Sequence, residues 1–472
     1  MSLTDCNFLI LMATMFNLAQ CSEIGDRLTA LPDDILTQNI LSHLPMKEAV
    51  RTSILAHGWR CLWSCIPGLD LDFDSAEKVA ACTRHSRKEM FCKGGKAAFD
   101  YVKWVDQVVG TCSRSSTALH HFRIRFRLDK SFSHEIESWL IFSLGKGVEV
   151  LELDFCLEDD IDEDPRYVLP SIQPRLFPKL RLLKSLCLGG LSTSNDSLEH
   201  LLLACQFLER LHLRNLASLS EVNITGPVSR LKYIDIFRCK TVRSIMISAR
   251  TPDLLSFTYP GWVEAVHVEH APRLVDLIIS QTKRRLDHFD LLAHPLFCFV
   301  AQLQSLHLSM RSWHMVYNWL PHLPNLSGLK HLKLSLDGLS FLDNQTRRAQ
   351  NLRGMVSLIK AAPCVQHLTL LVVSPLDPEL KICEEFANLN LQFLRVIEIV
   401  GFRGREVESE LAVQSSKCAA SLEKLIIDHR HPSSRGCIIG EYGGTKRERE
   451  EWRRSALEIQ QTLPSEVLMV VI

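Results

Sequence analysis

The sequence lacks an excess of charge of either sign. Across 472 residues, 54 Lys and Arg balance 54 Asp and Glu. Proteins that hold nucleic acid through its phosphates usually carry a basic excess, so no nucleic-acid partner is expected. Apolar residues make up 46% of the chain, which argues against wholesale disorder. The chain is too long for one compact core, and this predicts an elongated or multi-part architecture.

Cysteine pairs with metal-binding spacing are also missing. None of the 16 cysteines forms a C-x-x-C pair, and the nearest approach, Cys61 and Cys65, has three residues between the two. Structural zinc sites bring paired ligands at tight spacing, so we expect no metal and no other cofactor. Free thiols packed as small apolar groups in a reducing compartment explain the pattern better.

Sequence motifs of catalysis are absent. The chain has no phosphate-binding G-x-x-x-x-G-K-S/T loop, no G-x-G-x-x-G turn, no G-x-S-x-G elbow and no H-E-x-x-H helix. His134-Glu135 begins like the last of these, but Ser138 stands where the second histidine belongs. We therefore predict a non-catalytic protein.

One apolar run, residues 8–19, is too short to span a bilayer but resembles the core of a secretory signal. The residues before it contain Asp5 and no Lys or Arg, unlike such a signal. Four Asn-x-Ser/Thr sequons lie at Asn195, Asn223, Asn325 and Asn344. We expect a cytoplasmic and/or nuclear protein with no membrane partner, and a secreted or membrane-tethered repeat receptor is the alternative.

An internal repeat is the clearest positive feature. The pattern apolar-x-x-apolar-x-apolar occurs twelve times, at intervals that mostly lie near the roughly 20–29 residues of leucine-rich repeats. Its first positions are Leu119, Val148, Leu183, Leu208, Leu231, Leu254, Leu274, Leu303, Leu329, Val365, Leu394 and Leu422. Each copy predicts a short strand and then a helical or irregular return, such as a helix over 196–209. Stacked copies bury a continuous core, so the predicted fold is an α/β curved solenoid with a parallel sheet on its concave face.

The outward positions of these strands are mostly polar, as in a protein-binding surface. We expect a protein substrate to contact eight of them: Arg210, His212, Tyr233, Asp235, His307, His331, Lys333 and His367. The three histidines at 307, 331 and 367 come from consecutive copies. A metal site or a pH sensor is possible there, but no carboxylate or cysteine completes a ligand set, which favours plain exposed polar residues.

Three segments fall outside the repeat pattern. Residues 158–164, EDDIDED, predict a mobile loop because their like charges repel. Residues 84–103 carry several basic side chains and Gly94-Gly95, and are interpreted as a linker or solvated face. Residues 446–454, KREREEWRR, predict an exposed helix.

Residues 26–63 form a separate module with two Leu-Pro steps, each followed by acidic residues that favour a helix start. The first predicted helix aligns Leu36, Ile40 and Leu44 at steps of four. About forty residues cannot bury this much apolar surface alone, so either the solenoid or a partner must cover it.

The pattern DRLTALPDDIL…ILSHLP-x-KEAVRTSIL…W-R-x-LW resembles the F-box of plant F-box/leucine-rich-repeat proteins. Residues 394–428 are similar to the FBD region of the same family. The resemblance implies an N-terminal extension at 1–25, a three-helix F-box at 26–70, a linker and solenoid cap at 71–115, repeats at 116–390, and FBD-like repeats and a cap at 391–472.

That resemblance implies the substrate-recognition subunit of a Skp–cullin–F-box ubiquitin ligase. The F-box would bind a Skp-type adaptor and, through it, a cullin, while the repeats hold an unknown protein substrate. The expected adaptor-facing residues are Leu31, Pro32, Ile35, Leu36, Ile40, Leu41, Leu44, Pro45, Val50, Ile54 and Trp59. About half of them are expected to serve internal helix packing instead, as amphipathic stripes commonly do.

Two departures from the family pattern favour a further alternative, an F-box-like scaffold without a ligase role. The TQN stretch, residues 37–39, holds one residue more than usual, which turns the rest of the helix by about 100° unless a bulge absorbs it. His57-Gly58 replaces a basic pair, and glycine inside a helix costs about 1 kcal/mol relative to alanine.

Overall fold

The computed structural model describes residues 28, 31–72, 96–155, 167–169, 177–226, 228, 230–248, 251–260, 263–280, 295–310, 313, 326–339, 345–382, 386, 389–432 and 445–472. Several expectations lie outside these residues: the apolar run 8–19, the acidic segment 158–164, the first part of the 84–103 segment, and the sequons at Asn325 and Asn344. The later part of 84–103 begins a regular helix, α6, rather than a linker.

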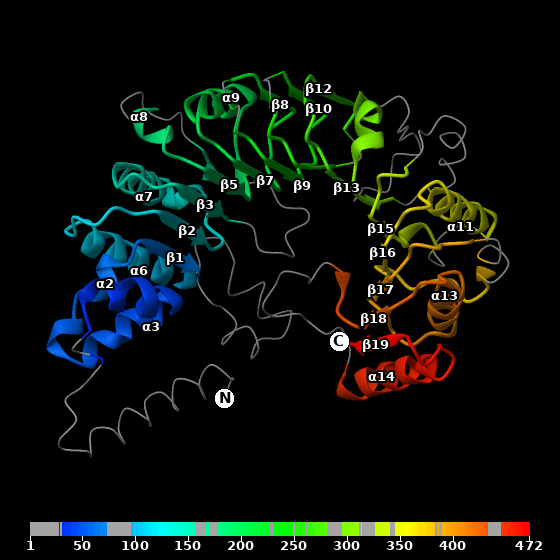
Figure 1. Ribbon diagram of the computed structural model, residues 1–472. Helices are drawn as coiled ribbons and strands as arrows, with labels where there is room; N and C mark the ends of the chain where they lie inside the picture. Colours follow the sequence, from blue (N-terminus) through cyan, green and yellow to red (C-terminus); the bar gives the residue numbers. More distant parts are fainter. Residues whose placement is uncertain are drawn as a thin grey trace, which may run out of the picture.

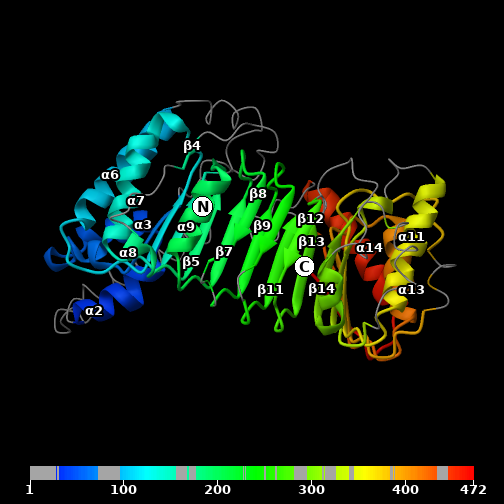
Figure 2. The same ribbon diagram turned by 90° about the horizontal axis from the view of Figure 1, so that it is seen from above.

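The main body of the molecule is a curved solenoid (Figure 1). One parallel sheet of 14 strands lines the inner side of the arc within the described part of the chain, and helices together with a small second sheet lie on the outer side (Figures 1 and 2). The strands follow one another in chain order, which confirms the predicted α/β solenoid with its concave parallel sheet. They are β1 (Gly68–Asp72), β2 (His121–Arg125), β3 (Val150–Asp154), β5 (Ser185–Gly189), β7 (Arg210–Arg214), β9 (Tyr233–Phe237), β11 (Ser256–Pro260), β13 (Asp276–Ser280), β14 (Ser305–Ser309), β15 (His331–Ser335), β16 (His367–Leu371), β17 (Val396–Val400), β18 (Lys424–Asp428) and β19 (Leu468–Val471).

All twelve repeat copies become strands of this sheet, from β2 to β18. The two terminal strands, β1 and β19, lie outside the repeat pattern and were not predicted. β1 follows directly on the N-terminal helices, and β19 follows the exposed C-terminal helix α14, Lys446–Gln460. That helix confirms the prediction for 446–454, and it begins with a capping box between Thr445 and Glu448.

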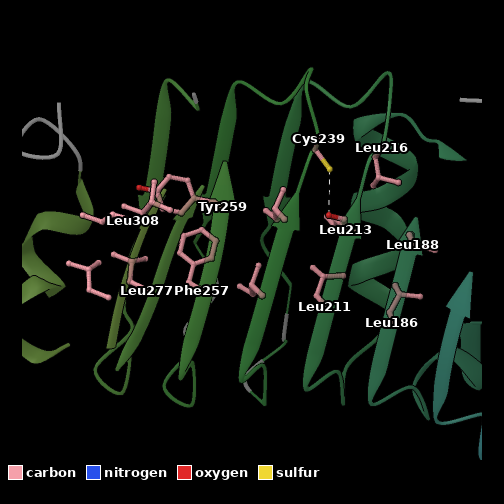
Figure 3. Close-up of a cluster of buried hydrophobic side chains, with 14 of the residues drawn as sticks. Leu186, Leu188, Leu211, Leu213, Leu216, Cys239, Phe257, Tyr259, Leu277 and Leu308 are labelled. Atoms are coloured by element: carbon pink, nitrogen blue, oxygen red, sulfur yellow. Dashed lines mark hydrogen bonds between the residues drawn. The ribbon is translucent and has the colours of Figure 1, made fainter. Parts of the chain in front are cut away.

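The core of the solenoid consists of the inward side chains of adjacent rungs (Figure 3). The second and fourth residues of each strand point into it, as Leu211 and Leu213 do on β7 and Phe257 and Tyr259 on β11. Cys239 donates from its thiol to the carbonyl oxygen of Leu213 at 3.5 Å, between neighbouring turns of the solenoid. Side chains that alternate along each strand thus bury one continuous apolar column.

The return segments form helices in some intervals and strands in others. Returns in the longer intervals hold helices: α7 (Ser133–Gly145), α9 (Asn195–Ala204), α11 (Gln345–Lys360) and α13 (Glu406–Lys417). The three shortest intervals hold strands instead: β8 (Glu221–Ile224), β10 (Ser244–Ile247) and β12 (Ala265–Val268). These form a second parallel sheet on the outer side. An extended segment covers more distance per residue than a helix, so it fits the shorter intervals, which have fewer residues for the return. The helix expected at 196–209 is α9, but it ends at Ala204 because Cys205 leaves the helical conformation; its Leu198, Leu201 and Leu202 are buried.

The remaining described elements are short. Around the N-terminal module and α6 they are α2 (Asp33–Ile35), η1 (Leu36–Ile40), η2 (Leu41–His43), α3 (Met46–Arg51), η3 (Thr52–Ile54), η4 (His57–Trp59), η5 (Leu62–Cys65) and α6 (Lys96–Cys112). Among the returns they are η6 (Lys130–Phe132), β4 (Tyr167–Val168), α8 (Phe177–Leu180), β6 (Leu191–Ser192), η8 (Pro295–Gln302) and η11 (Asp337–Leu339).

Candidate interaction surfaces

The expected adaptor-facing residues of the N-terminal helices fall into three groups by solvent exposure. Buried ones are Leu36, Leu41 and Trp59; half-buried ones are Leu31, Ile40, Leu44 and Val50; exposed ones are Pro32, Ile35, Pro45 and Ile54. Leu55 is also exposed and was missed, although its place beside Ile54 in the apolar stripe was a usable signal.

A π-helix lies where the sequence has its additional residue. Over Leu36–Ile40 the helix widens, and the N–H of Leu41 donates to the carbonyl oxygen of Leu36 five residues back. Leu41, rather than Ile40, therefore joins Leu36 in the core, and the predicted stripe at steps of four is wrong from Ile40 onward. The bulge absorbs the additional residue and keeps the helix amphipathic.

Gly58 lies outside any α-helix, so the predicted cost of glycine there does not arise. The second helical segment ends with η3 at Ile54, and Ala56 is extended before a short 3₁₀ turn over His57–Trp59. A Cβ added at Gly58 would meet no atom within 4 Å. The two prolines, Pro32 and Pro45, each occupy the residue just before a helix rather than its first turn.

The N-terminal helices are joined tightly to the solenoid. Lys47 Nζ lies 5.6 Å from the ring centre of Trp104 on α6. Tyr101, from the same helix, is fully buried and donates its hydroxyl to the carbonyl oxygen of Leu71 on β1 at 2.5 Å. Burial raises the pKa of Tyr101. The solenoid therefore covers the inner face of this module, and only its outer face is left for a partner.

On the concave face, the first rungs carry a lattice of alternating charges. Arg123 lies 3.3 Å from both Asp70 and Glu152, and Arg125 lies 3.8 Å from both Asp72 and Asp154. A hydrogen bond from His121, together with the charge of Arg123, lowers the pKa of Glu152. Four carboxylates face two arginines here, so the first rungs keep a negative excess.

The next concave group lies on β7 and β9, where the structure brings together four of the expected substrate residues. Arg210 stacks over Tyr233, with its guanidinium carbon 5.2 Å from the ring centre. His212 Nδ1 and Arg214 Nη2 both approach the same oxygen of Asp235, at 3.3 and 3.4 Å. Arg214 was missed by the sequence analysis, although it follows Arg210 and His212 at the same two-residue spacing.

The other four expected residues meet on β14, β15 and β16. His331 and His367 occupy paired positions, with ring centres 5.8 Å apart, and His307 pairs with Lys333. Burial, and then the charge of Lys333, lowers the pKa of His307 to about 3. Burial and the nearby His367 lower that of His331. His367 Nε2 lies 3.7 Å from Glu398, so a carboxylate does lie beside this trio.

Neither group forms a recognisable reactive centre. Among the described residues, no three His, Cys, Asp or Glu side chains come together to hold a metal ion. Cys187, His212 and Asp235 follow one another on adjacent rungs, in the order of a cysteine nucleophile, a base and an orienting acid. Burial raises the pKa of Cys187 to about 12, however, so its thiol is protonated at neutral pH and unsuited to nucleophilic attack.

One sequon has a structural role. The Asn195 side chain donates to Ser220 Oγ at 2.9 Å and accepts from the N–H groups of Ser220 and Glu221 at 3.0 and 3.2 Å. A glycan on its amide nitrogen would compete with this link between α9 and β8. Within the described ranges, no helix combines the length and apolarity needed to cross a bilayer.

Comparison with known proteins places this architecture in a family. The family described as At1g61320/AtMIF1, LRR domain, matches residues 170–467, more than half of the chain. The chain belongs to this leucine-rich-repeat family. The match extends from the segment before α8 to the residue before β19, so the rungs from β5 to β18 are part of one repeat domain.

Curated relatives in Arabidopsis thaliana are named as F-box and leucine-rich-repeat proteins. The chain is 24% identical over 432 residues to putative F-box/LRR-repeat protein At5g02930, covering 85% of this chain and 84% of that protein. It is 28% identical over 263 residues to putative F-box/LRR-repeat protein At3g58880, covering 51% and 53%. It is 32% identical over 133 residues to F-box/FBD/LRR-repeat protein At5g22700, covering 28% and 25%. These names confirm the family that the sequence resembles.

Proposed function

We propose that this protein is the substrate-recognition subunit of a Skp–cullin–F-box ubiquitin ligase. Its N-terminal helices bind a Skp-type adaptor, which connects it to a cullin, and its repeats hold a protein substrate. The chain performs no chemistry itself. It raises the local concentration of substrate lysines near the site of ubiquitin transfer. This role places it in the cytoplasm and/or nucleus.

The observation that carries the proposal is the exposed apolar surface of the N-terminal helices. Ile54 is 81% exposed, the largest fraction among the described large apolar residues, and Ile35 is 41% exposed. The solenoid covers the other face of these helices, so a partner is the remaining way to bury them. We assign adaptor contact to Pro32, Ile35, Pro45 and Ile54, with the half-buried Leu31, Ile40, Leu44 and Val50 around them.

Leu36, Leu41 and Trp59 have another role under this proposal. All three are buried within the chain, so they hold the helices in position and do not touch the adaptor. A charge at Leu36 would unfold the module, and loss of capture by such a variant would not identify an interface. Variants that test the proposal must therefore change exposed residues.

The side chain of Asn195 is engaged in three hydrogen bonds, which removes this sequon from the support for a secreted receptor. The alternative of a scaffold without adaptor binding rested on the TQN stretch and His57-Gly58. The π-helix absorbs the first departure, and the second lies outside any α-helix. Both departures are thus compatible with adaptor binding.

The test is co-purification of the full chain with a plant Skp adaptor. We expect stoichiometric capture by the native chain and loss of capture by the Ile35→Asp/Ile54→Asp double variant. The control is Leu203→Asp, which adds one carboxylate at an exposed leucine of α9 on the solenoid. Circular dichroism should show all three chains folded. Failure of the native chain to capture the adaptor would exclude the ligase role and favour the scaffold.

A further inference from the structure

The outward side chains of β7 are all basic. Arg210, His212 and Arg214 share one side of the strand at every second residue, so about 6.6 Å separates each from the next. Both arginines are exposed, and His212 is half-buried. Within the described part of the chain, Asp235 forms ion-pair contacts with His212 and Arg214 of this row, and the charge of Asp154 also acts on Arg214. The row therefore keeps unmatched positive charge.

Arg210 has no carboxylate partner among the described residues. Its guanidinium lies over the ring of Tyr233, which holds the planar group in place while its N–H edges stay available. The acid that precedes it in the sequence, Glu209, is paired with Lys232 Nζ at 2.9 Å. Arginine and tyrosine are enriched among the residues that contribute most of the binding energy at protein interfaces.

The neighbouring rungs leave space beside the row. On β5 the outward residues are Ser185, Cys187 and Gly189, all small. Gly189 has no room for a side chain, because a Cβ there would lie 2.6 Å from Asp154 Oδ1. The acids beyond, Glu152 and Asp154 on β3, are held by Arg123 at 3.3 Å and Arg125 at 3.8 Å. A ligand above β7 would therefore meet the positive charge of Arg210 and Arg214, while the carboxylates that outnumber Arg123 and Arg125 lie on the far side of β5.

We propose that this basic row binds an extended acidic segment of the substrate, with anionic side chains at alternate positions. The inference rests on the proposed role of the repeats in holding a substrate. Alternate side chains of an extended peptide are also about 6.6 Å apart, so they match Arg210, His212 and Arg214 one to one. The anionic groups are either carboxylates of Asp or Glu or phosphates on Ser or Thr, since guanidinium binds both in paired hydrogen bonds.

The test is fluorescence anisotropy of labelled decapeptides with the full chain. Three peptides carry Glu, phosphoserine or Gln at alternate positions and Ala between them. We expect the Glu or phosphoserine peptide to bind, with affinity falling as salt is raised, and the Gln peptide not to bind. Whichever acidic peptide binds more tightly shows whether the row prefers carboxylates or phosphates. Equal binding of the Gln peptide would overturn the proposal.

The Arg210→Met/Arg214→Met variant should weaken binding of the acidic peptide by roughly tenfold or more, since it removes charged hydrogen-bond donors. Arg273→Met is the control. It removes an exposed arginine that lies outside the row and is paired with Asp253 at 2.8 Å. Equal loss in both variants, or loss on Lys333→Met alone, would overturn the assignment to β7. A single-stranded oligonucleotide that binds as tightly and loses affinity in the same variant would also overturn it.

Adaptor capture separates failure of this inference from failure of the proposed function. The Arg210→Met/Arg214→Met variant should still capture the Skp adaptor, because β7 lies apart from the N-terminal helices (Figure 1). Peptide binding is measured without the adaptor. A chain that captures the adaptor but binds no acidic peptide would refute only this inference.

Discussion

Leu41 donates its backbone N–H to the carbonyl oxygen of Leu36, five residues earlier, in the middle of the first N-terminal helix. Both leucine side chains are buried. In a regular α-helix, residues five apart are about 140° out of phase, and they cannot share one buried face as residues four apart do. The π-turn therefore lets this helix carry one residue more without losing its core.

Deletion of Asn39 should convert this segment into an ordinary α-helix. The residue is exposed, and its removal leaves Leu36 and the former Leu41 four positions apart, still on one face. We expect the midpoint of thermal unfolding to stay the same or to rise, and adaptor capture to be retained.

The control is deletion of Lys103, an exposed residue inside the regular helix α6. It should turn the following residues by about 100° and expose Val105 and Val108, which are buried. That deletion should lower the midpoint of thermal unfolding. Equal damage from the two deletions would show that the π-turn does not compensate for an additional residue.

Cys187 should react slowly with thiol reagents. Its pKa of about 12 leaves on the order of one thiolate in ten thousand at pH 8, and its side chain is buried beside His212. Cys61 is exposed and should react faster than Cys187. Mass spectrometry of tryptic peptides after a timed exposure to iodoacetamide measures both rates. Alkylation of Cys187 as fast as Cys61 would indicate an activated thiol and reopen the question of catalysis.

The periodic part of the molecule could be predicted from the sequence, since each of twelve apolar triplets supplies one strand. The exceptions have local causes. β1 and β19 occur once each at the ends of the sheet, where no repeat precedes or follows to reveal them. The outer strands β8, β10 and β12 depend on interval length, which a search for apolar periodicity does not weigh.

The candidate surfaces were predicted less completely. Alternation along the strands placed Arg210, His212, Tyr233 and Asp235 on one surface, and the structure brings them together. Which N-terminal leucines are buried could not be predicted, because Leu41 enters the core only through the hydrogen-bond shift of the π-turn. The helix α6, which packs on these helices, lies elsewhere in the chain, so a local sequence pattern could not predict this contact.

Replacement of His307 should make the protein less sensitive to acid. Its pKa is about 3 in the folded chain and about 6.5 when unfolded, so between these values the unfolded chain binds a proton that the folded chain does not. Stability from the neutral buried imidazole is therefore full above pH 6.5 and is lost as the pH falls towards 3. In His307→Gln, the urea midpoint should decline less steeply between pH 6.5 and 4.

Glu408 is the comparison for this measurement, because burial raises its pKa. The stability contribution of a carboxyl with a raised pKa decreases as the pH rises, in the opposite sense to His307. Glu408→Gln should therefore leave the acid-side decline in place. If His307→Gln declines as steeply as the native chain, the buried imidazole is not the source of the acid sensitivity.

Truncation of Leu211 to alanine should destabilise the middle of the solenoid. Leu211 is fully buried on β7, between Leu186 and Ile234 of the adjacent rungs, and the cavity left by such a change costs about 2–5 kcal/mol. Because each repeat contacts mainly its neighbours, the loss should be local. Hydrogen exchange should rise in β5, β7 and β9, while β16 and β17 should stay protected.

Leu203→Ala is the matched control, since this leucine of α9 is exposed and its truncation leaves no buried cavity. It should change the free energy of unfolding by less than about 0.5 kcal/mol, as surface substitutions usually do. Exchange that rises equally along all strands in Leu211→Ala would mean that the solenoid unfolds as one cooperative unit. In that case the N-terminal helices, which depend on β1 and α6 for their core, should lose adaptor capture in the same variant.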